Sequence, residues 1–257
     1  MQIKRGDDTL VENAFEQHMK KTGKNSPSTT IKAISFDLDD TLWDNRPVLY
    51  AAEQTLFDWL VEHYPRIGEL HDVLSFRQMR LDLAAEREEL RHHMTRLRKV
   101  SLQLLAEAAG YDDSLVEPAF EVFIEARHRI TLYDDVTPGL QALRNQGFLL
   151  GALTNGNADI GRLDMAHLFD FSLTAESAGS AKPDPQMFLQ ACRQLNIEPS
   201  ELAHVGDEHA TDIVGACNAG ATAVWMNRLV CDIPNDPQHH YEVKDMAELL
   251  VLAQSWR

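Results

Sequence analysis

The sequence predicts an α/β fold built on a doubly wound parallel sheet, with an all-helical domain inserted into it. Three observations support this prediction. Short apolar runs recur along the chain, helical segments separate the later runs, and a long stretch without strand patterns follows the first run. Strands that alternate with helices form parallel sheets, because the helices supply the crossover connections. The 257 residues suffice for one such domain with a sizeable insertion, or for two modest domains.

Five apolar runs predict the strands. Residues 31–36 are apolar and β-branched-rich and lead directly into Asp37, a pattern typical of a strand buried on both faces. Similar runs occur at residues 148–153, 171–174, 202–205 and 221–225. Helices separate the later runs: Thr137-Pro138 begins one that Gly147 ends, and residues 185–195 and 212–219 form two more. Together these elements predict a Rossmann-like core.

Residues 45–135 show helical periodicity instead of strand patterns. We therefore expect three parts: a polar N-terminal extension at residues 1–30, a Rossmann-like core at residues 31–44 and 136–257, and a helical cap at residues 45–135. One long cap helix is expected to end at Gly110. Its predicted buried face consists of Leu90, Met94, Leu97, Leu104, Leu105 and Ala108.

The charge balance narrows the possible partners. With 40 acidic and 24 basic residues, the formal net charge is −16, which repels nucleic acid and anionic membranes. A small phosphorylated metabolite needs a local site made by a metal ion and a few donors. No apolar run reaches membrane-spanning length, and the N-terminus lacks the apolar core of a signal peptide. We expect a soluble, cytoplasmic monomer or homodimer. Cys192, Cys217 and Cys231 lack the spacing of a zinc site or a disulfide framework.

Polar residues gather where the predicted strands end. In a parallel sheet these ends share one edge, and ligands bind there. Clustered carboxylates repel one another unless a cation holds them, and an oxygen-rich site suits Mg²⁺. The residues are Asp37, Asp39 and Asp40 after the first strand, Thr154 and Asn155 after the second, Lys182 before the fourth, and Asp207 and Asp212 after the fourth.

Phosphate chemistry fits this set of side chains. Asp37 and Asp39, two residues apart on an extended segment, point the same way. Asp37 can therefore attack phosphorus while Asp39 handles the proton. Lys182 adds positive charge that orients the nucleophile and stabilises the transition state. The Thr154 hydroxyl and nearby backbone N–H groups are natural donors to a phosphate.

Four segments resemble, in order, the motifs of the haloacid dehalogenase superfamily. They are residues 37–42 (DLDDTL), 153–157 (LTNGN) and 181–185 (AKPDP), followed by Gly206-Asp207 with Asp212. The resemblance covers about residue 31 to the C-terminus. The helical insertion after the first motif is the cap position of the branch with α-helical caps.

The resemblance implies a mechanism. Asp37 would form an aspartyl-phosphate, and Asp39 would protonate the leaving oxygen and then activate water. Lys182 would stabilise charge. True dehalogenases of the superfamily lack the second acidic residue and need no metal, so Asp39 disfavours dehalogenation.

The resemblance also implies ligand sets. Thr154, with Asn155 and Gly156, would hold the phosphate. Asp212 would either contact the metal or brace Lys182. Mg²⁺ would be held by Asp37, by the backbone carbonyl of Asp39 and by Asp207.

A narrower resemblance concerns substrate. Residues 36–48, 154–158 and 204–207 are similar to bacterial flavin-pathway phosphatases, which act on FMN and on 5-amino-6-(5-phospho-D-ribitylamino)uracil. Arg46, Arg96 and Arg98 in the cap are candidate substrate contacts, with packing or salt bridges as the alternative. Sugar or nucleotide phosphates, transfer by a phosphomutase, and a non-catalytic binding or regulatory role stay open.

Overall fold

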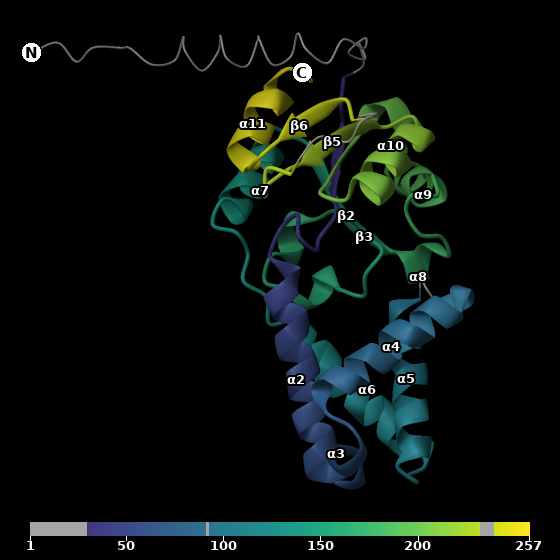
Figure 1. Ribbon diagram of the computed structural model, residues 1–257. Coiled ribbons are helices and arrows are strands. Elements are labelled where there is room, and N and C mark those ends of the chain that lie inside the picture. Colours follow the sequence, from purple (N-terminus) through teal and green to yellow (C-terminus); the bar gives the residue numbers. More distant parts are fainter. Residues whose placement is uncertain (1–29, 91–92, 232–238) are drawn as a thin grey trace, which may run out of the picture.

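The computed structural model describes residues 30–90, 93–231 and 239–257. The predicted N-terminal extension, except for residue 30, lies outside the described residues. A core built on one sheet joins a separate group of helices through the start of α2 and the segment after α6 (Figure 1). Within the described ranges, no helix has the length and apolar character needed to cross a membrane.

Six parallel strands form the sheet in the order β3-β2-β1-β4-β5-β6. All five predicted strands are present, with small shifts at their ends. The sequence analysis missed β6, because this short edge strand has no apolar run and is defined by its pairing with β5. The strands are β1 (Ala33–Phe36), β2 (Leu149–Thr154), β3 (Phe171–Thr174), β4 (Leu202–Gly206), β5 (Thr222–Met226) and β6 (Tyr241–Val243).

Both faces of the sheet are covered by helices. Successive residues of β1 point to opposite faces, so Ile34 and Phe36 pack in one apolar core and Ala33 in the other. The first core includes residues of α7 and α11, and the second includes residues of α9 and α10 (Figure 1). Coverage of both faces explains why all four residues of β1 are buried. The helices are α7 (Val136–Asn145), α8 (Ala175–Ala178), α9 (Gln186–Leu195), α10 (Val214–Ala219) and α11 (Met246–Gln254).

The register of the central strands brings their carboxyl ends together. Phe36, the last residue of β1, pairs with Ala152 of β2 and with Val205 of β4. The next residue, Asp37, donates its backbone N–H to the carbonyl of Val205 at 2.8 Å. The polar residues that follow these three strands therefore leave the sheet at the same edge, as the sequence analysis predicted.

Helices follow β1, and no strand lies among the described residues between α2 and α7. The Asp44 carboxylate caps α2 by accepting a hydrogen bond from the backbone N–H of Arg46 at 3.0 Å. These helices have their own apolar core, in which α2 packs along α6. The predicted cap limits at residues 45 and 135 stay a prediction. The helices are α2 (Asn45–His63), α3 (Arg66–Leu70), α4 (Val73–Glu86), α5 (Met94–Ala108) and α6 (Val116–Arg127).

The predicted buried face of α5 is partly wrong. Leu97 and Leu105 are buried, but Leu104 and Ala108 are exposed, and Leu90 belongs to a separate short turn before the helix. The true buried face includes two polar residues whose side chains find partners inside the cap, so an apolar pattern alone gave the wrong phase. Its members are Leu97, Arg98, Ser101, Leu102, Leu105 and Ala106.

Candidate active site

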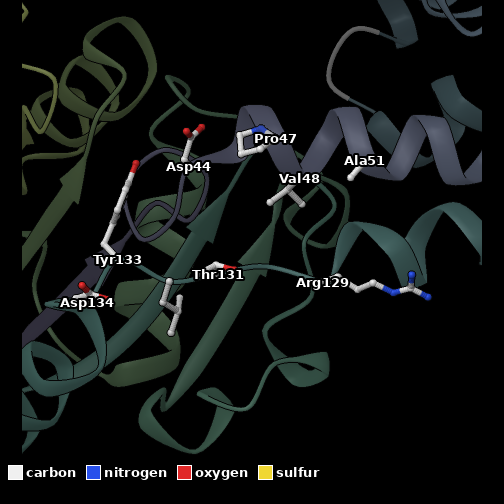
Figure 2. A pocket seen from close by; sticks show the side chains of 9 residues that line it. Asp44, Pro47, Val48, Ala51, Arg129, Thr131, Tyr133 and Asp134 are labelled. Atoms are coloured by element: carbon white, nitrogen blue, oxygen red, sulfur yellow. The ribbon is translucent and has the colours of Figure 1, made fainter.

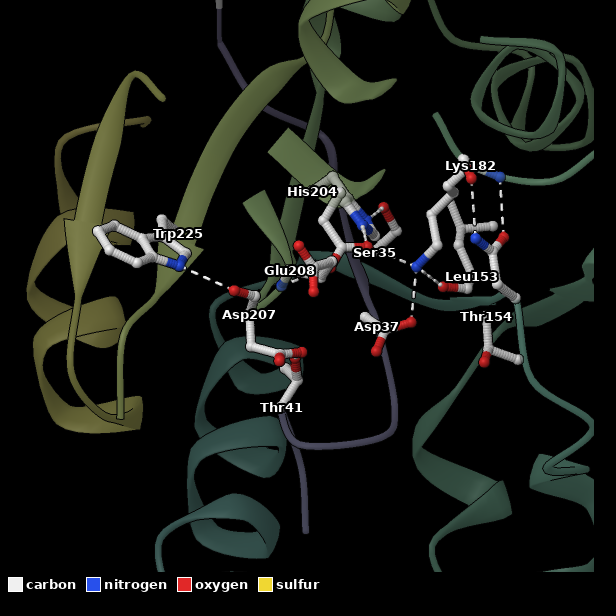
Figure 3. A network of polar contacts seen from close by, with 12 residues as sticks. Ser35, Asp37, Thr41, Leu153, Thr154, Lys182, His204, Asp207, Glu208 and Trp225 are labelled. Atoms are coloured by element: carbon white, nitrogen blue, oxygen red, sulfur yellow. Dashed lines mark hydrogen bonds and ion pairs between the residues drawn. The ribbon is translucent and has the colours of Figure 1, made fainter. Parts of the chain in front are cut away.

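Three charged side chains form a linked group at the carboxyl edge of the sheet. Lys182 Nζ lies 2.6 Å from an oxygen of Asp37 and 2.6 Å from an oxygen of Asp212. It also donates to the carbonyl of Leu153 at 2.6 Å. Lys182 and Asp212 are each 1% exposed, and Asp37 is 9% exposed. The structure thus places the ammonium group of Lys182 in contact with Asp37, the predicted nucleophile (Figure 3).

Asp207 adds a third carboxylate to this group. One oxygen each from Asp37, Asp207 and Asp212 lie within 4.8 Å of one another. Opposite ligands of one Mg²⁺ lie about 4.2 Å apart, because each Mg–O bond is about 2.1 Å long. The all-oxygen donor set suits Mg²⁺, and the 4.8 Å limit is close to this distance, so the three carboxylates could share one cation. Thr41 fixes Asp207 by donating its hydroxyl to the carboxylate at 3.0 Å, and Trp225 donates to the Asp207 carbonyl at 2.9 Å.

The three carboxyl groups differ in how their surroundings shift their pKa values. Burial raises the pKa of Asp207 to about 7, and the charge of Asp212 adds to that rise. Burial also raises the pKa of Asp37 well above its ordinary value, against the opposing effect of Lys182. Burial acts the same way on Asp212, but Lys182 and a hydrogen bond from His204 outweigh it and lower its pKa to about 2. A divalent cation beside Asp37 and Asp207 would stabilise their charged forms.

The affinity for Mg²⁺ is expected to fall as the pH is lowered through about 7, the pKa of Asp207. Below that pH the metal-free folded protein holds a proton on Asp207, and a cation must displace this proton in order to bind. Titration calorimetry one pH unit above and one below this value measures the effect, with proton release expected at the lower pH. Equal affinities at the two values would contradict the prediction.

Asp212 is held by residues on two strands and the loop after β4. His204 Nε2 lies 3.2 Å from the oxygen that also contacts Lys182, and His204 Nδ1 lies 2.9 Å from the Ser35 hydroxyl. The backbone N–H of Glu208 donates to the other Asp212 oxygen at 3.0 Å. Both oxygens of Asp212 thus have protein donors, which supports its role in bracing Lys182. Its role as a metal ligand stays a prediction.

Gly206→Ala is expected to lower the free energy of unfolding by about 1–3 kcal/mol. An added Cβ would lie 2.3 Å from Cγ of Asp212, whose hydrogen bonds prevent it from moving aside. Urea unfolding measures the change. Gly161→Ala is the matched control, because its Cβ would meet only the exposed side chain of Asp159. Equal stability of the two variants would argue against a tightly fixed Asp212.

The loop after β2 approaches the site and also supports the lysine loop. Thr154 Oγ1 accepts the N–H of Gly156 at 2.9 Å, and a Cβ on Gly156 would lie 3.0 Å from an Asp39 oxygen. The Asn155 side chain forms two hydrogen bonds of 2.8 Å with the backbone N–H and carbonyl of Lys182. The amide is thus occupied in positioning the lysine loop, and its predicted contact with substrate stays a prediction.

The sequence analysis missed the partner of Asp39. Both Asp39 oxygens accept hydrogen bonds from Nη2 of Arg127, at 2.5 and 2.7 Å. Arg127 is the last residue of α6 and is 1% exposed. The two residues are 88 positions apart, and a single arginine at the end of a helix belongs to no motif, so sequence offered no signal for this pair.

The predicted substrate contact at Arg98 is not supported, because this side chain is buried inside the cap. Its Nη2 lies 3.3 Å from an oxygen of Glu53, and its guanidinium lies 3.8 Å from the centre of the Phe123 ring. Burial is the main cause that lowers the pKa of Arg98 to about 9. Arg77 and Arg80 also bind Glu53.

Arg46 and Arg96, the other candidate cap contacts, are exposed. No contact among the described residues joins either side chain to the carboxylate group. Both stay predictions.

A cavity of about 440 Å³ lies at the junction of cap and core (Figure 2). Asp44 and Tyr133 lie at one end of it and Arg129 at the other. None of the predicted catalytic residues lines it, so the carboxylate group and not this cavity marks the candidate active site. Its lining residues are Asp44, Pro47, Val48, Ala51, Arg129, Thr131, Leu132, Tyr133 and Asp134.

Comparison with known proteins identifies the family. The family model of haloacid dehalogenase-like hydrolases matches residues 31–220. The chain is a haloacid dehalogenase-like hydrolase. This confirms the resemblance inferred from the four motifs, and it makes the chain an enzyme.

Several proteins similar to this haloacid dehalogenase-like hydrolase are phosphatases. The 5-amino-6-(5-phospho-D-ribitylamino)uracil phosphatase YigB of Escherichia coli (strain K12) is 31% identical over 204 residues, which cover 78% of this chain and 85% of YigB. A glyceraldehyde 3-phosphate phosphatase of Methanopyrus kandleri is also 31% identical, over 77% of this chain and 84% of its own. These relatives support hydrolysis of phosphoric monoesters.

Solved structures confirm the fold of this haloacid dehalogenase-like hydrolase. A structure described as 2-haloacid dehalogenase from Pseudomonas syringae pv. Tomato DC3000 superimposes with a TM-score of 0.82 and 38% identity. The match covers 88% of this chain and all of that one.

Proposed function

We propose that the chain is a Mg²⁺-dependent phosphatase that hydrolyses a small phosphorylated metabolite through an aspartyl-phosphate on Asp37. The observation that supports this most directly is the contact of Lys182 with both Asp37 and Asp212, beside a third carboxylate at metal-sharing distance. A buried ammonium and a divalent cation together offset the charge of an incoming phosphate. They also hold the nucleophile in one orientation.

The first chemical step transfers the phosphoryl group to the enzyme. An oxygen of Asp37 forms a bond to phosphorus while the bond from phosphorus to the leaving oxygen breaks. Asp39 donates a proton to that oxygen, so the alcohol leaves neutral. Lys182, held by Asp212 and by the Leu153 carbonyl, keeps Asp37 in line.

The second step releases phosphate. A water oxygen forms a bond to phosphorus while Asp39 takes a proton from the water. The bond between phosphorus and Asp37 then breaks, which restores the free carboxylate.

Mg²⁺, when bound, supplies positive charge that stabilises the phosphoryl group in the transition state. Asp37 and Asp207 would hold it through side-chain oxygens, and Asp39 through its backbone carbonyl. The chain prepares this arrangement without the metal, since Thr41 fixes Asp207 and Lys182 fixes Asp37.

For the substrate we propose FMN or 5-amino-6-(5-phospho-D-ribitylamino)uracil. YigB is named for the second of these, and the chain resembles flavin-pathway phosphatases at the first motif. Other relatives are named for glyceraldehyde 3-phosphate and phosphoserine. Glyceraldehyde 3-phosphate and phosphoserine are therefore the alternative substrates to test.

Dehalogenation is the second candidate, because the solved structure with 38% identity is described as a dehalogenase. Asp39 argues against this activity. A halide leaves as a stable anion and needs no proton, whereas the alkoxide of a phosphate ester does. A carboxylate placed two residues after the nucleophile therefore serves ester hydrolysis.

A substrate panel tests the proposal. We expect phosphate release from FMN or the ribitylaminouracil phosphate with Mg²⁺, loss of release with EDTA, and recovery when Mg²⁺ is added in excess. Phosphate release from glyceraldehyde 3-phosphate or phosphoserine, and from no other ester, would replace the proposed substrate with that compound. Chloride release from 2-chloropropionate, without phosphate release from any ester, would overturn the phosphatase assignment.

A further inference from the structure

Arg127 ties the cap to the acid–base residue of the core. Its Nη2 donates to both oxygens of Asp39, and its side chain is only 2% exposed. Among the described residues, its guanidinium makes no other hydrogen bond, and Nη1 has no partner at all. A guanidinium buried in this way is costly unless it is paired. Asp39 is therefore the partner that stabilises the buried guanidinium of Arg127.

The surroundings of Arg127 fix its position. The next residue, His128, accepts a hydrogen bond at 2.8 Å from the backbone N–H of Asp159, in the loop after β2. The guanidinium carbon lies 6.0 Å from the centre of the Trp43 ring, which is fully buried. The backbone of Trp43 bridges both to Asp39 and to Leu132 in the segment after α6. Arg127 and Asp39 are thus held in one framework at the junction of cap and core.

Separate cations hold two of the three carboxylates of the first motif. Lys182, from a loop of the core, binds Asp37, and Arg127, from the last turn of the cap, binds Asp39. Two nearby carboxylates with different partners can carry different tasks. The nucleophile is oriented by the core, whereas the acid–base residue is oriented by the cap.

We propose that Arg127 is a positioning residue that aims Asp39 at the leaving oxygen of the substrate. This inference rests on the proposed phosphatase function. In the first step the protonated form of Asp39 gives its proton to the ester oxygen as the phosphorus–oxygen bond breaks, while its other oxygen still accepts from Arg127. In the second step Asp39 takes a proton from water, which restores the protonated form. Arg127 takes no part in either bond change. It holds the carboxylate in the direction from which both proton transfers occur.

The test compares two leaving groups in the full-length chain with Mg²⁺. An alkyl phosphate that the wild type hydrolyses needs a proton on its leaving oxygen, whereas p-nitrophenyl phosphate releases a stable phenolate. We expect Arg127→Met to lower kcat for the alkyl ester about 10²-fold or more, with little change in KM. The first turnover of p-nitrophenyl phosphate should fall less than about tenfold. A slow steady state should follow that turnover, because Asp39 also activates the water.

Two further variants separate positioning from folding. Arg127→Lys keeps one donor and the charge, and should recover part of the alkyl-ester rate. Arg144→Met removes an arginine that binds Asp170 at 2.9 Å in the core, and should leave the ratio of the two rates unchanged. Thermal unfolding of each variant identifies a loss of fold. If Arg127→Met does not fold, the comparison of leaving groups is made with Arg127→Lys.

The outcomes distinguish the inference from the function on which it rests. A wild-type chain that releases phosphate neither from any ester of the substrate panel nor from p-nitrophenyl phosphate overturns the phosphatase assignment. If the wild type is active, an equal loss for both esters in the first turnover, or no loss for either, overturns the role of Arg127 alone.

Discussion

Asp37→Asn is expected to reduce kcat by at least about 10⁴-fold, the scale seen when the nucleophile of a covalent mechanism is lost. The amide keeps the shape of the side chain and can still accept from Lys182, but it cannot form the acyl phosphate. Phosphate release measures the loss. Mass spectrometry of acid-quenched enzyme should find a phosphoryl adduct on Asp37 in the wild type and none in the variant.

The stability of the same variant gives an internal control. Burial raises the pKa of Asp37, which shows that its charge is unfavourable in the metal-free protein. Lys182 keeps its contacts with Asp212 and the Leu153 carbonyl in this variant, so removing the Asp37 charge should leave the melting temperature unchanged or higher. A folded but inactive variant then separates loss of the nucleophile from unfolding. Asp164→Asn changes an exposed carboxylate that, among the described residues, has no contact with Asp37, Lys182 or Asp207, and it should keep full activity. Unchanged turnover in Asp37→Asn would rule out the covalent mechanism.

Lys182→Met is expected to lower the free energy of unfolding by about 3–5 kcal/mol, the usual cost of removing one partner of a buried ion pair. Lys182 and Asp212 are each 1% exposed, so water cannot solvate the carboxylates left behind. Activity should fall about 10²–10³-fold, because a preorganised positive charge is lost beside the phosphoryl group. Urea unfolding in EDTA and steady-state kinetics with Mg²⁺ measure the two effects.

Lys32→Met is the matched control for this loss of an ammonium. Lys32 binds Glu201 at 2.7 Å, but its side chain is 55% exposed, so water and salt screen the pair. Exposed pairs contribute about 0–1 kcal/mol, and activity should not change. Similar losses of stability and of activity in the two variants would contradict the central role of the buried Lys182.

The sequence by itself determined the parts that depend on local pattern. The apolar runs before Asp37, Thr154 and Asp207 predicted three central strands, and the structure has them at β1, β2 and β4. Parallel pairing then brought the ends of these strands to one edge. Lys182 was also predicted for this site, and it lies 2.6 Å from Asp37. Local hydrophobicity and turn chemistry suffice for such features, since each is encoded within a few consecutive residues.

Polar pairs between distant segments were decided only by the tertiary structure. Arg98 had the sequence features of a substrate contact, but packing of α2 and α5 against α6 buries it beside Glu53 and Phe123. Arg127 had no such features, yet it is the partner of Asp39. A charged side chain in a helix looks the same in sequence whether it faces water or a buried carboxylate. Its environment is set by which helices pack together, and that depends on the whole chain.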